Sequence, residues 1–427
     1  MMNGRPPARM DHPMLSPDPI VIIGAGIAGL ACGRELQRQG REFMICEASG
    51  RVGGRLGSVV VDGIVCDLGF QVSMSNYRSL ETLVDRHTLK RHPFVSGSMV
   101  WTGESRIRIL DPKRHPLGSL QPLFKGLVGW RDLRAANRCR RLAARAETLE
   151  DSSESAMEII RRTGFSDRFI ESFLRPFFGG VFLDETLSVP AARFLRTLDR
   201  FARGNAEVPD GGMQAIAEEL AEPIREHIRL QSPVTETNER SVVLNTGETI
   251  SSAGVVMATP FDVTARLLGA SPPQAGQWSS TTAVHFETGT PAITEPIIVL
   301  NGSGTGAINL LCSPSGVAPG IAPHGRHSLL ASLRPTRGDV EPSIDLDGIQ
   351  AEAATILGID SSDWRHLTTC HVSEALPRRV TMALLSDLPA GTQVAGDWLG
   401  DPSIDDAIQS GIDAAGRCLS DESRNHS

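Results

Sequence analysis

The chain has 427 residues, 40% of them hydrophobic and 22% charged, which is close to the average of globular proteins and long enough for two or three domains. A net charge of −8 and an aromatic content of 5% argue against a nucleic-acid partner. The seven cysteines are scattered without a CxxC pair, so we expect reduced thiols in a cytoplasmic protein, and neither a zinc nor an iron–sulfur site.

The two ends of the chain show no pattern of regular structure. Residues 1–17 contain four prolines among polar residues and lack the apolar core of a secretory signal, so we predict a disordered leader. Residues 420–427 are polar throughout and predict a disordered tail. Between them, no apolar run reaches the roughly 18 residues that a membrane span requires.

The first predicted strand leads into a glycine-rich turn and a helix. Residues 20–23 are apolar and β-branched, which suits a buried parallel strand, and residues 27–39 suit the helix. Gly24 permits the tight turn, Gly26 lets the backbone approach a pyrophosphate, and Gly29 lets the helix pack closely on the sheet. Because the helix N-terminus would face the phosphates with its N–H groups and dipole, the pattern predicts a dinucleotide site.

An acidic residue follows the second predicted strand. Residues 43–46 suit that strand, and Glu47 comes directly after it, 18 positions beyond Gly29. An acid that accepts hydrogen bonds from the adenosine ribose usually lies roughly 20 residues on. A 2′-phosphate beside Glu47 would be repelled, so this position argues against NADP.

Two arginines and a glycine pair come next. Arg51 and Arg55 flank Gly53-Gly54, where the backbone can approach a pyrophosphate and the guanidinium groups could face it. The alternative is a solvated turn. Residues 59–69 then predict a hairpin with Asp62-Gly63 at its turn, ending at Gly69, where a flat ring could lie against the backbone.

The middle of the chain alternates between helical and extended patterns. Helices are predicted at 79–86, 129–150, 153–162 and 166–178, then at 213–220, and a hairpin is predicted around Gly247. Alternating runs at 281–287, 296–300, 306–311 and 327–334 predict a half-buried antiparallel sheet. We expect this sheet to form the wall of a substrate chamber.

A second glycine motif lies near the end of the chain. Val394-Ala395 are expected to finish a strand, Gly396 allows close approach, and Asp397 could accept hydrogen bonds from cofactor hydroxyls. The alternative is that Asp397 only caps a turn.

The helix predicted at 404–418 follows this motif, with Ser403 as its N-cap. Its first-turn N–H groups could face an oxygen that gains negative charge when the cofactor is reduced. Asp405 and Asp406 stabilise the helix dipole, but either would oppose that charge if it pointed inward.

Together these motifs resemble those of the FAD-dependent amine oxidase and phytoene desaturase superfamily, which includes protoporphyrinogen oxidases. The resemblance covers about residues 18–420 and rests on residues 24–29, 47–55, 67–69, 209–213, 234, 254–260, 396–397 and 410–411, while 313–323 and 374–377 look like the desaturase-like bacterial members. It implies an α/β fold with a Rossmann-type FAD-binding domain (GR2-like), formed by 18–75, 205–262 and 385–419. The discontinuous α+β substrate domain would comprise 76–204 and 263–384, with a mixed or antiparallel sheet and a helical lobe.

From the motifs and the resemblance together, we expect non-covalent FAD to be bound by Gly24, Gly26, Ile27, Ala28, Gly29, Glu47, Ala48, Arg51, Gly54, Arg55, Gly69, Phe70, Gln71, Val234, Gly396, Asp397 and Ile404. The resemblance places a backbone contact to the adenine at Val234. No cysteine lies near the C-terminal glycine motif, so a covalent flavin is not expected.

Two residues are candidates for a catalytic role. Trp398 would lie near the ring system, and Gln71 could donate to an oxygen of the flavin or the substrate. His371 could act as a base, but a hydrogen-bonded structural role is favoured. The 11 histidines form no ligand-spaced cluster with carboxylates, so no metal is predicted.

The resemblance implies two-electron oxidation of a small molecule, with hydride transfer to flavin N5. Amine oxidases of this superfamily often have a lysine near N5 and an aromatic cage. Here the only lysines are Lys90, Lys113 and Lys125, and the only tyrosine is Tyr77. We therefore favour a desaturase-like oxidation of an apolar substrate, with oxygen or a quinone as the acceptor. The alternatives are a true amine oxidase that produces hydrogen peroxide, and a non-catalytic escort protein like the Rab GDP-dissociation inhibitors.

One further segment raises the question of peripheral membrane contact. Residues 117–130 are largely apolar, and six arginines follow at helical spacing: Arg131, Arg134, Arg138, Arg140, Arg141 and Arg145. Such a basic amphipathic segment could lie on a bilayer. The sequence favours the alternative, an ordinary helix with solvated arginines.

Overall fold

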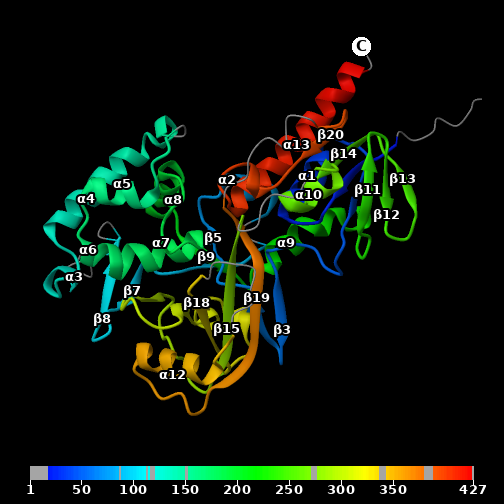
Figure 1. The fold of residues 1–427 in the computed structure, drawn as a ribbon. Helices are drawn as coiled ribbons and strands as arrows, with labels where there is room; N and C mark the ends of the chain where they lie inside the picture. Colours follow the sequence, from blue (N-terminus) through cyan, green and yellow to red (C-terminus); the bar gives the residue numbers. More distant parts are fainter. Residues whose placement is uncertain are drawn as a thin grey trace, which may run out of the picture.

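The computed structural model describes residues 18–85, 88–111, 114–115, 121–149, 152–270, 277–335, 343–378 and 388–425 (Figure 1). The predicted leader, residues 1–17, lies outside the described residues. The last helix, α13 (Ile404–Asn425), continues past the predicted end at residue 418 and into the segment predicted as a disordered tail. Neither glycine nor proline stands between residues 419 and 425, so nothing in that stretch terminates the helix.

A five-stranded parallel sheet forms one half of the molecule. Its strand order is β10 (Ile228–Arg229), β2 (Phe43–Cys46), β1 (Ile20–Ile23), β14 (Gly254–Met257) and β20 (Thr392–Val394). The two neighbours of β1, which are β2 and β14, lie far apart in the sequence, as is typical of a doubly wound α/β fold. The predicted strands at 20–23 and 43–46 are confirmed to the residue.

Both faces of this sheet are covered, which explains why its strands are apolar without alternation. Ile20 and Ile22 pack in one core with the helices α1 (Ile27–Arg38), α9 (Gln214–Ala221) and α13. Val21 and Ile23 pack in a second core, against the small antiparallel sheet of β11 (Val234–Asn238), β12 (Ser241–Leu244) and β13 (Thr249–Ser251).

The second half contains a seven-stranded mixed sheet. Its order is β19 (Arg365–Pro377), β15 (Trp278–Thr288), β18 (His327–Leu333), β17 (Ile308–Cys312), β16 (Ile298–Asn301), β7 (Gly97–Trp101) and β8 (Arg106–Leu110). All neighbours are antiparallel except β16 and β7, which are parallel. The long strands β15 and β19 run from the parallel-sheet half into this sheet (Figure 1). The predicted fold class is confirmed, although the sequence did not indicate β7, β8 or β19.

A lobe of helices lies beside this sheet, at the left of Figure 1. Its helices are α4 (Trp130–Ala143), α5 (Ala156–Thr163), α6 (Asp167–Phe169), α7 (Arg175–Phe182) and α8 (Ala191–Arg203). Its core contains a row of phenylalanines at every fourth position, with ring centroids 5.1 Å apart for Phe169–Phe173 and 5.6 Å for Phe173–Phe177.

Two helix predictions in this lobe were wrong in detail. The helix predicted at 129–150 is interrupted after Ala143, and a 3₁₀ turn follows at Ala146–Leu149. The helix predicted at 166–178 contains a π-helical turn, Ile170–Leu174. Pro176 lies just beyond this turn and has no N–H to donate, which disfavours regular α-helical bonding there.

The remaining elements connect these parts. They are the hairpin β3 (Ser58–Val61) and β4 (Ile64–Asp67), the sheet β5-β9-β6 (Ser73–Met74, Ala206–Pro209, Arg91–Pro93), and the helices α2 (Arg78–Leu83), α3 (Gln121–Phe124), α10 (Phe261–Leu267), α11 (Pro314–Val317) and α12 (Leu346–Leu357). The predicted hairpin turn at Asp62-Gly63 is confirmed, and both residues have positive φ, 50° and 82°.

Candidate dinucleotide site

The glycine-rich turn lies at the carboxyl end of β1, where parallel α/β sheets bind their ligands. Gly24 has a φ of 102°, and a Cβ there would lie 2.8 Å from the carbonyl oxygen of Ala258. A Cβ on Gly29 would lie 1.9 Å from the Gly24 oxygen, so this glycine allows α1 to pack directly on the turn. By contrast, no atom lies within 4 Å of the position that a Cβ on Gly26 would take, so Gly26 faces open space.

The N-terminus of α1 is free to bind an anion. No side chain caps it, and no acidic residue lies in its first turn, which begins with Ile27 and Ala28. The first backbone N–H groups of a helix have no partner within the helix. Positive electrostatic potential is therefore directed into the open space beside Gly26.

Glu47 lies beside the same turn. Its carboxylate accepts hydrogen bonds from the backbone N–H of Ala25 at 2.7 Å and from that of Ser49 at 2.8 Å. Its carbonyl oxygen accepts from the N–H of Ser232 at 2.8 Å, which brings the segment leading to Val234 next to it. Ala48 is exposed. The structure thus places Glu47 and Val234, 187 positions apart in the sequence, on one side of the turn.

The second glycine pair touches the first turn. Gly26 and Gly53 form a parallel bridge, and Gly54, with a φ of 57°, lies beside Gly26. Arg51 folds back over this loop and donates to the carbonyl oxygen of Gly54 at 2.8 Å and to Gln214 Oε1 at 3.1 Å. Arg51 therefore holds the loop in shape in this structure.

Arg55 and Asp397 form the link between the two ends of the chain. The guanidinium donates to both carboxylate oxygens, with Nη1–Oδ2 at 2.9 Å and Nη2–Oδ1 at 2.5 Å. The Arg55 and Asp397 side chains are 31% and 9% exposed. Burial disfavours the charged guanidinium, but the facing carboxylate outweighs this and raises the pKa of Arg55. The bidentate geometry is the strong form of a carboxylate–arginine pair.

Two buried polar atoms beside Arg55 have no hydrogen-bond partner among the described residues. Gln71 donates through Nε2 to the Arg55 carbonyl at 3.2 Å, but its Oε1 is unsatisfied. The Arg55 guanidinium lies 5.2 Å from the ring of Trp278, whose Nε1 is also unsatisfied. Unpaired buried polar atoms are rare, and each requires an explanation. An unpaired acceptor and an unpaired donor on residues that contact Arg55 fit a polar ligand such as a dinucleotide.

Trp398 is part of the core. It is 4% exposed, packs with residues of β14 and β20, and donates through Nε1 to the carbonyl oxygen of Thr259 at 3.2 Å. A Cβ on Gly396 would lie 2.5 Å from that nitrogen, so Gly396 makes room for the indole. The only polar atom of the Trp398 side chain is therefore already hydrogen-bonded to the backbone. A catalytic role for Trp398 stays a prediction.

The N-terminus of α13 has the predicted cap. Ser403 Oγ accepts from the N–H of Asp406 at 3.1 Å, and Ile404 is partly buried against the core of α1. Asp406 pairs with Arg200 at 3.0 Å, and Asp405 accepts from the N–H groups of Ser79 and Leu80 at the start of α2. Both carboxylates are therefore bonded to other residues of the chain, Asp406 to Arg200 and Asp405 to the start of α2.

Helix α8 presents three arginines toward the segment that contains Asp397. Arg196 pairs with Asp401 (Nη2–Oδ1 2.9 Å), and Arg200 pairs with Asp406. Arg193 is 5% exposed and lies over the ring of Phe182, 5.1 Å from its centroid, without an ion pair to any described residue. Burial lowers its pKa, while the negative charges of Asp401, Asp397 and Asp184 act in the opposite direction. No helix was predicted from the sequence at α8.

A buried polar group lies behind Gly69. Asp67 is 8% exposed, and its Oδ1 accepts from Ser58 Oγ and from the N–H of Met213. Its carbonyl accepts from Nε2 of His285, whose pKa is lowered to about 4 by burial. Gly69 itself lies against β15, since a Cβ on Gly69 would lie 3.0 Å from the side chain of Thr281. The next residue, Phe70, contacts Phe94 edge to face, with the ring centroids 6.1 Å apart.

Replacing Asp67 with Asn should change how stability depends on pH. Burial outweighs the two hydrogen bonds and raises the pKa of Asp67 from 3.8 to about 6. The folded state therefore holds this proton more tightly, and ionisation destabilises it progressively as the pH rises from about 4 to about 6. Asparagine keeps the accepting oxygen and cannot ionise. Relative to the parent, we expect the free energy of unfolding of the variant to rise by up to about 3 kcal/mol between pH 4 and pH 8, as measured by urea unfolding. A pH-independent difference, equal to that of the exposed control Asp413→Asn, would contradict this.

His371 is hydrogen-bonded within the mixed sheet. It lies on β19, and its Nδ1 bonds to Oγ1 of Thr282 on β15 at 2.8 Å. This agrees with the favoured interpretation of the sequence. Within the described ranges no group of three or more His, Cys, Asp or Glu could hold a metal ion.

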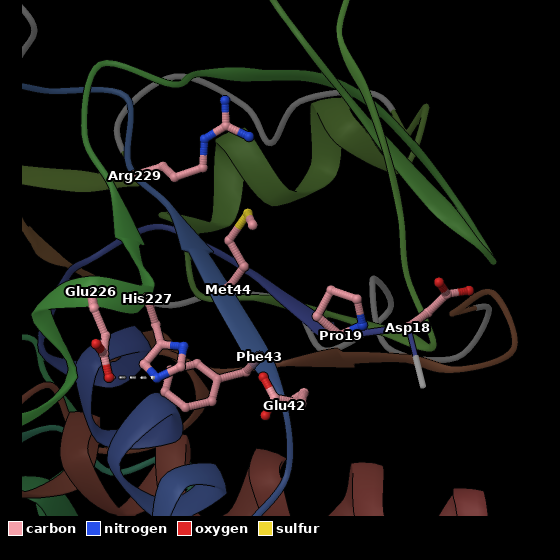
Figure 2. A pocket seen from close by; sticks show the side chains of 8 residues that line it. All are labelled: Asp18, Pro19, Glu42, Phe43, Met44, Glu226, His227 and Arg229. Carbon is pink, nitrogen blue, oxygen red and sulfur yellow. Dashed lines mark ion pairs between the residues drawn. The ribbon is translucent and has the colours of Figure 1, made fainter. Parts of the chain in front are cut away.

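A cavity of ≈ 320 Å³ lies at the opposite edge of the parallel sheet (Figure 2). It is lined by Asp18, Pro19, Glu42, Phe43, Met44, Glu226, His227 and Arg229. The rings of Phe43 and His227 stack there at 4.4 Å. Because Pro19 and Glu42 directly precede β1 and β2, the cavity lies at the amino ends of these strands and is separate from the glycine-rich turns.

Comparison with known proteins agrees with this geometry. The family model of the flavin-containing amine oxidoreductases matches residues 27–419. AofH of Mycobacterium tuberculosis, assigned as a flavin-containing monoamine oxidase, is 29% identical over 260 residues, 56% of each chain. Putrescine oxidase of Kocuria rosea is 36% identical over 127 residues, 26% of this chain and 25% of that protein. The chain thus spans about half or less of the length of these curated relatives.

Solved structures show the same fold. A putrescine oxidase bound to putrescine superposes with a TM-score of 0.70 at 18% identity, covering 94% of this chain and 99% of that chain. Reduced UDP-galactopyranose mutase gives 0.67 at 17% identity, covering 95% and 96%. The predicted resemblance and the FAD cofactor are confirmed at the level of the family: this chain belongs to the flavin-containing amine oxidoreductases.

Proposed function

We propose that the chain is an FAD-dependent oxidoreductase that removes two electrons from an apolar small molecule, in the manner of a desaturase. One observation carries the proposal: Arg55 and Asp397, 342 positions apart, meet beside the paired glycine turns. A chain with no dinucleotide to bind would have little reason to bury this pair next to two unsatisfied polar atoms.

The chain's own residues would hold the cofactor non-covalently. The first turn of α1 would bind the pyrophosphate, Glu47 would accept from the ribose hydroxyls, and Gln71 would use its unsatisfied oxygen. When bound, FAD supplies a two-electron acceptor.

Three features support an apolar substrate over an amine. Lys90 and Lys125 are exposed, and the third lysine, Lys113, lies outside the described residues. The single tyrosine, Tyr77, is 8% exposed with Arg200 over its ring at 5.9 Å. The unpaired guanidinium of Arg193 would repel a protonated amine that approached Asp397 from the helical lobe. True amine oxidation remains the second candidate, because AofH and putrescine oxidase are relatives.

The purified protein should be yellow, with a flavin spectrum that survives gel filtration and is released by denaturation. Anaerobic bleaching is then measured with separate panels of carotenoid precursors, porphyrinogens and amines, followed by reoxidation with oxygen or a quinone. Bleaching by an apolar panel supports the proposal, and bleaching by amines alone selects the alternative. Colourless protein that cannot take up FAD would support the escort protein instead.

Replacing Glu47 with Ala should weaken flavin retention by roughly 10- to 100-fold, because hydrogen bonds to a charged acceptor are lost. Retention is measured from the flavin-to-protein absorbance ratio during dilution and gel filtration. Glu42→Ala is the matched control, since Glu42 is exposed at the other end of β2. Equal retention in both variants would show that Glu47 does not bind the ribose.

A further inference from the structure

The outer surface of α3 and α4 combines exposed aromatic rings with unpaired arginines. Phe124 is 86% exposed and Trp130 is 73% exposed, the two largest values among the exposed large hydrophobic side chains of the described residues, ahead of Val60 at 68%. They lie six positions apart, on either side of the turn that joins α3 to α4. Lys125, between them, is also exposed.

The arginines of α4 continue this surface along the helix. At about 100° per residue, Trp130, Arg134, Arg138, Arg141 and Arg145 fall within about 80° of one another around the helix axis, with Arg145 just past its last turn. All five are exposed, whereas Ala135 and Cys139 on the opposite side are fully buried in the lobe. We call the set formed by Phe124, Lys125, Trp130, Arg134, Arg138, Arg141 and Arg145 the α4 face.

Little negative charge offsets the α4 face. The one acid within α4, Asp132, is 3% exposed and accepts from the backbone N–H groups of Gly129 and Ser166. In the described part of the chain, Arg134, Arg141 and Arg145 have no ion-pair partner. Because the chain as a whole has a net charge of −8, a concentration of unpaired cations on one helix is unusual.

We propose that the α4 face docks on an anionic lipid surface, with Phe124 and Trp130 at the headgroup level and the arginines on lipid phosphates. Aromatic rings favour the membrane interface, and basic side chains favour anionic headgroups. None of the described helices is long and apolar enough to cross a bilayer, so the contact is peripheral. The proposal does not depend on the redox activity. Nucleic acid fits less well, because two rings at one end of a helix form no row on which successive bases could stack.

The test is flotation of the full-length protein with vesicles. We expect flotation with phosphatidylcholine–phosphatidylserine vesicles, little with phosphatidylcholine alone, and loss at high salt. Arg134→Gln with Arg141→Gln should lower binding about fivefold per arginine. Phe124→Ser with Trp130→Ser should lower it roughly tenfold or more, without changing the melting temperature, because both rings are exposed.

Control variants remove the same charge, or one exposed apolar side chain, elsewhere on the surface. Arg240→Gln with Arg266→Gln and Val60→Ser change exposed residues on other surfaces and should bind like the parent. Absence of flotation with anionic vesicles, or equal binding by the α4-face variants and the controls, would overturn the proposal. So would tighter binding of RNA or DNA than of vesicles, lost in the same α4-face variants.

Discussion

Replacing Asp397 with Ala should lower the free energy of unfolding by about 3 kcal/mol and reduce flavin content. The carboxylate is 9% exposed and is the ion-pair partner of Arg55, which is itself mostly withdrawn from water. Removing one member of such a pair leaves the other charge desolvated and uncompensated. The measurement is urea unfolding, together with the flavin-to-protein ratio of the purified variant.

Two comparisons make this result specific. Asp413→Ala removes an exposed carboxylate of α13, which accepts a hydrogen bond from Gln409 on the same helix, and should change stability little. The double variant Arg55→Ala, Asp397→Ala should lose less stability than the sum of the single variants, because the uncompensated charge is gone. Additive losses would mean that the pair does not act as a unit.

Replacing Gly411 with Ala should also lower the free energy of unfolding by about 3 kcal/mol. A Cβ at this position would lie 2.1 Å from the carbonyl oxygen of Ala28 and 3.0 Å from the backbone N of Cys32. Both are backbone atoms of α1, which cannot yield as a flexible side chain would. The helix α13 would have to move away from the first turn of α1, so we also expect weaker flavin retention.

The same helix supplies the control. Gly416 has no atom within 4 Å of a Cβ, so Gly416→Ala should stabilise the protein by about 0.5–1 kcal/mol through helix propensity. Opposite signs for the two alanine variants in urea unfolding would confirm that close packing of α13 on α1 is the reason for glycine at 411. A stabilising Gly411→Ala would contradict it.

Several features of this protein were predictable because they depend on neighbours in the sequence. The strand at 20–23, its glycine turn and α1 are encoded by β-branched residues followed by spaced glycines. The Asp62-Gly63 hairpin needs two residues that tolerate positive φ, and the sequence supplies them. The N-cap at Ser403 needs only a hydroxyl three residues before Asp406. The division into domains and the cofactor-binding roles of individual residues stay predictions.

Other features arise only when distant segments pack together. That Arg55 would pair with Asp397, that Trp398 would donate to Thr259 from inside a core, and that α8 would bring arginines to the same region could not be read from local spacing. The π-turn before Pro176 and the partners of β15 likewise depend on what the rest of the fold accommodates. The sequence by itself therefore determined the glycine turns and the elements beside them, because backbone conformation is set by a few adjacent residues. Only the tertiary structure decided which charges are paired and which rings are buried, because those depend on contacts between segments up to 342 positions apart.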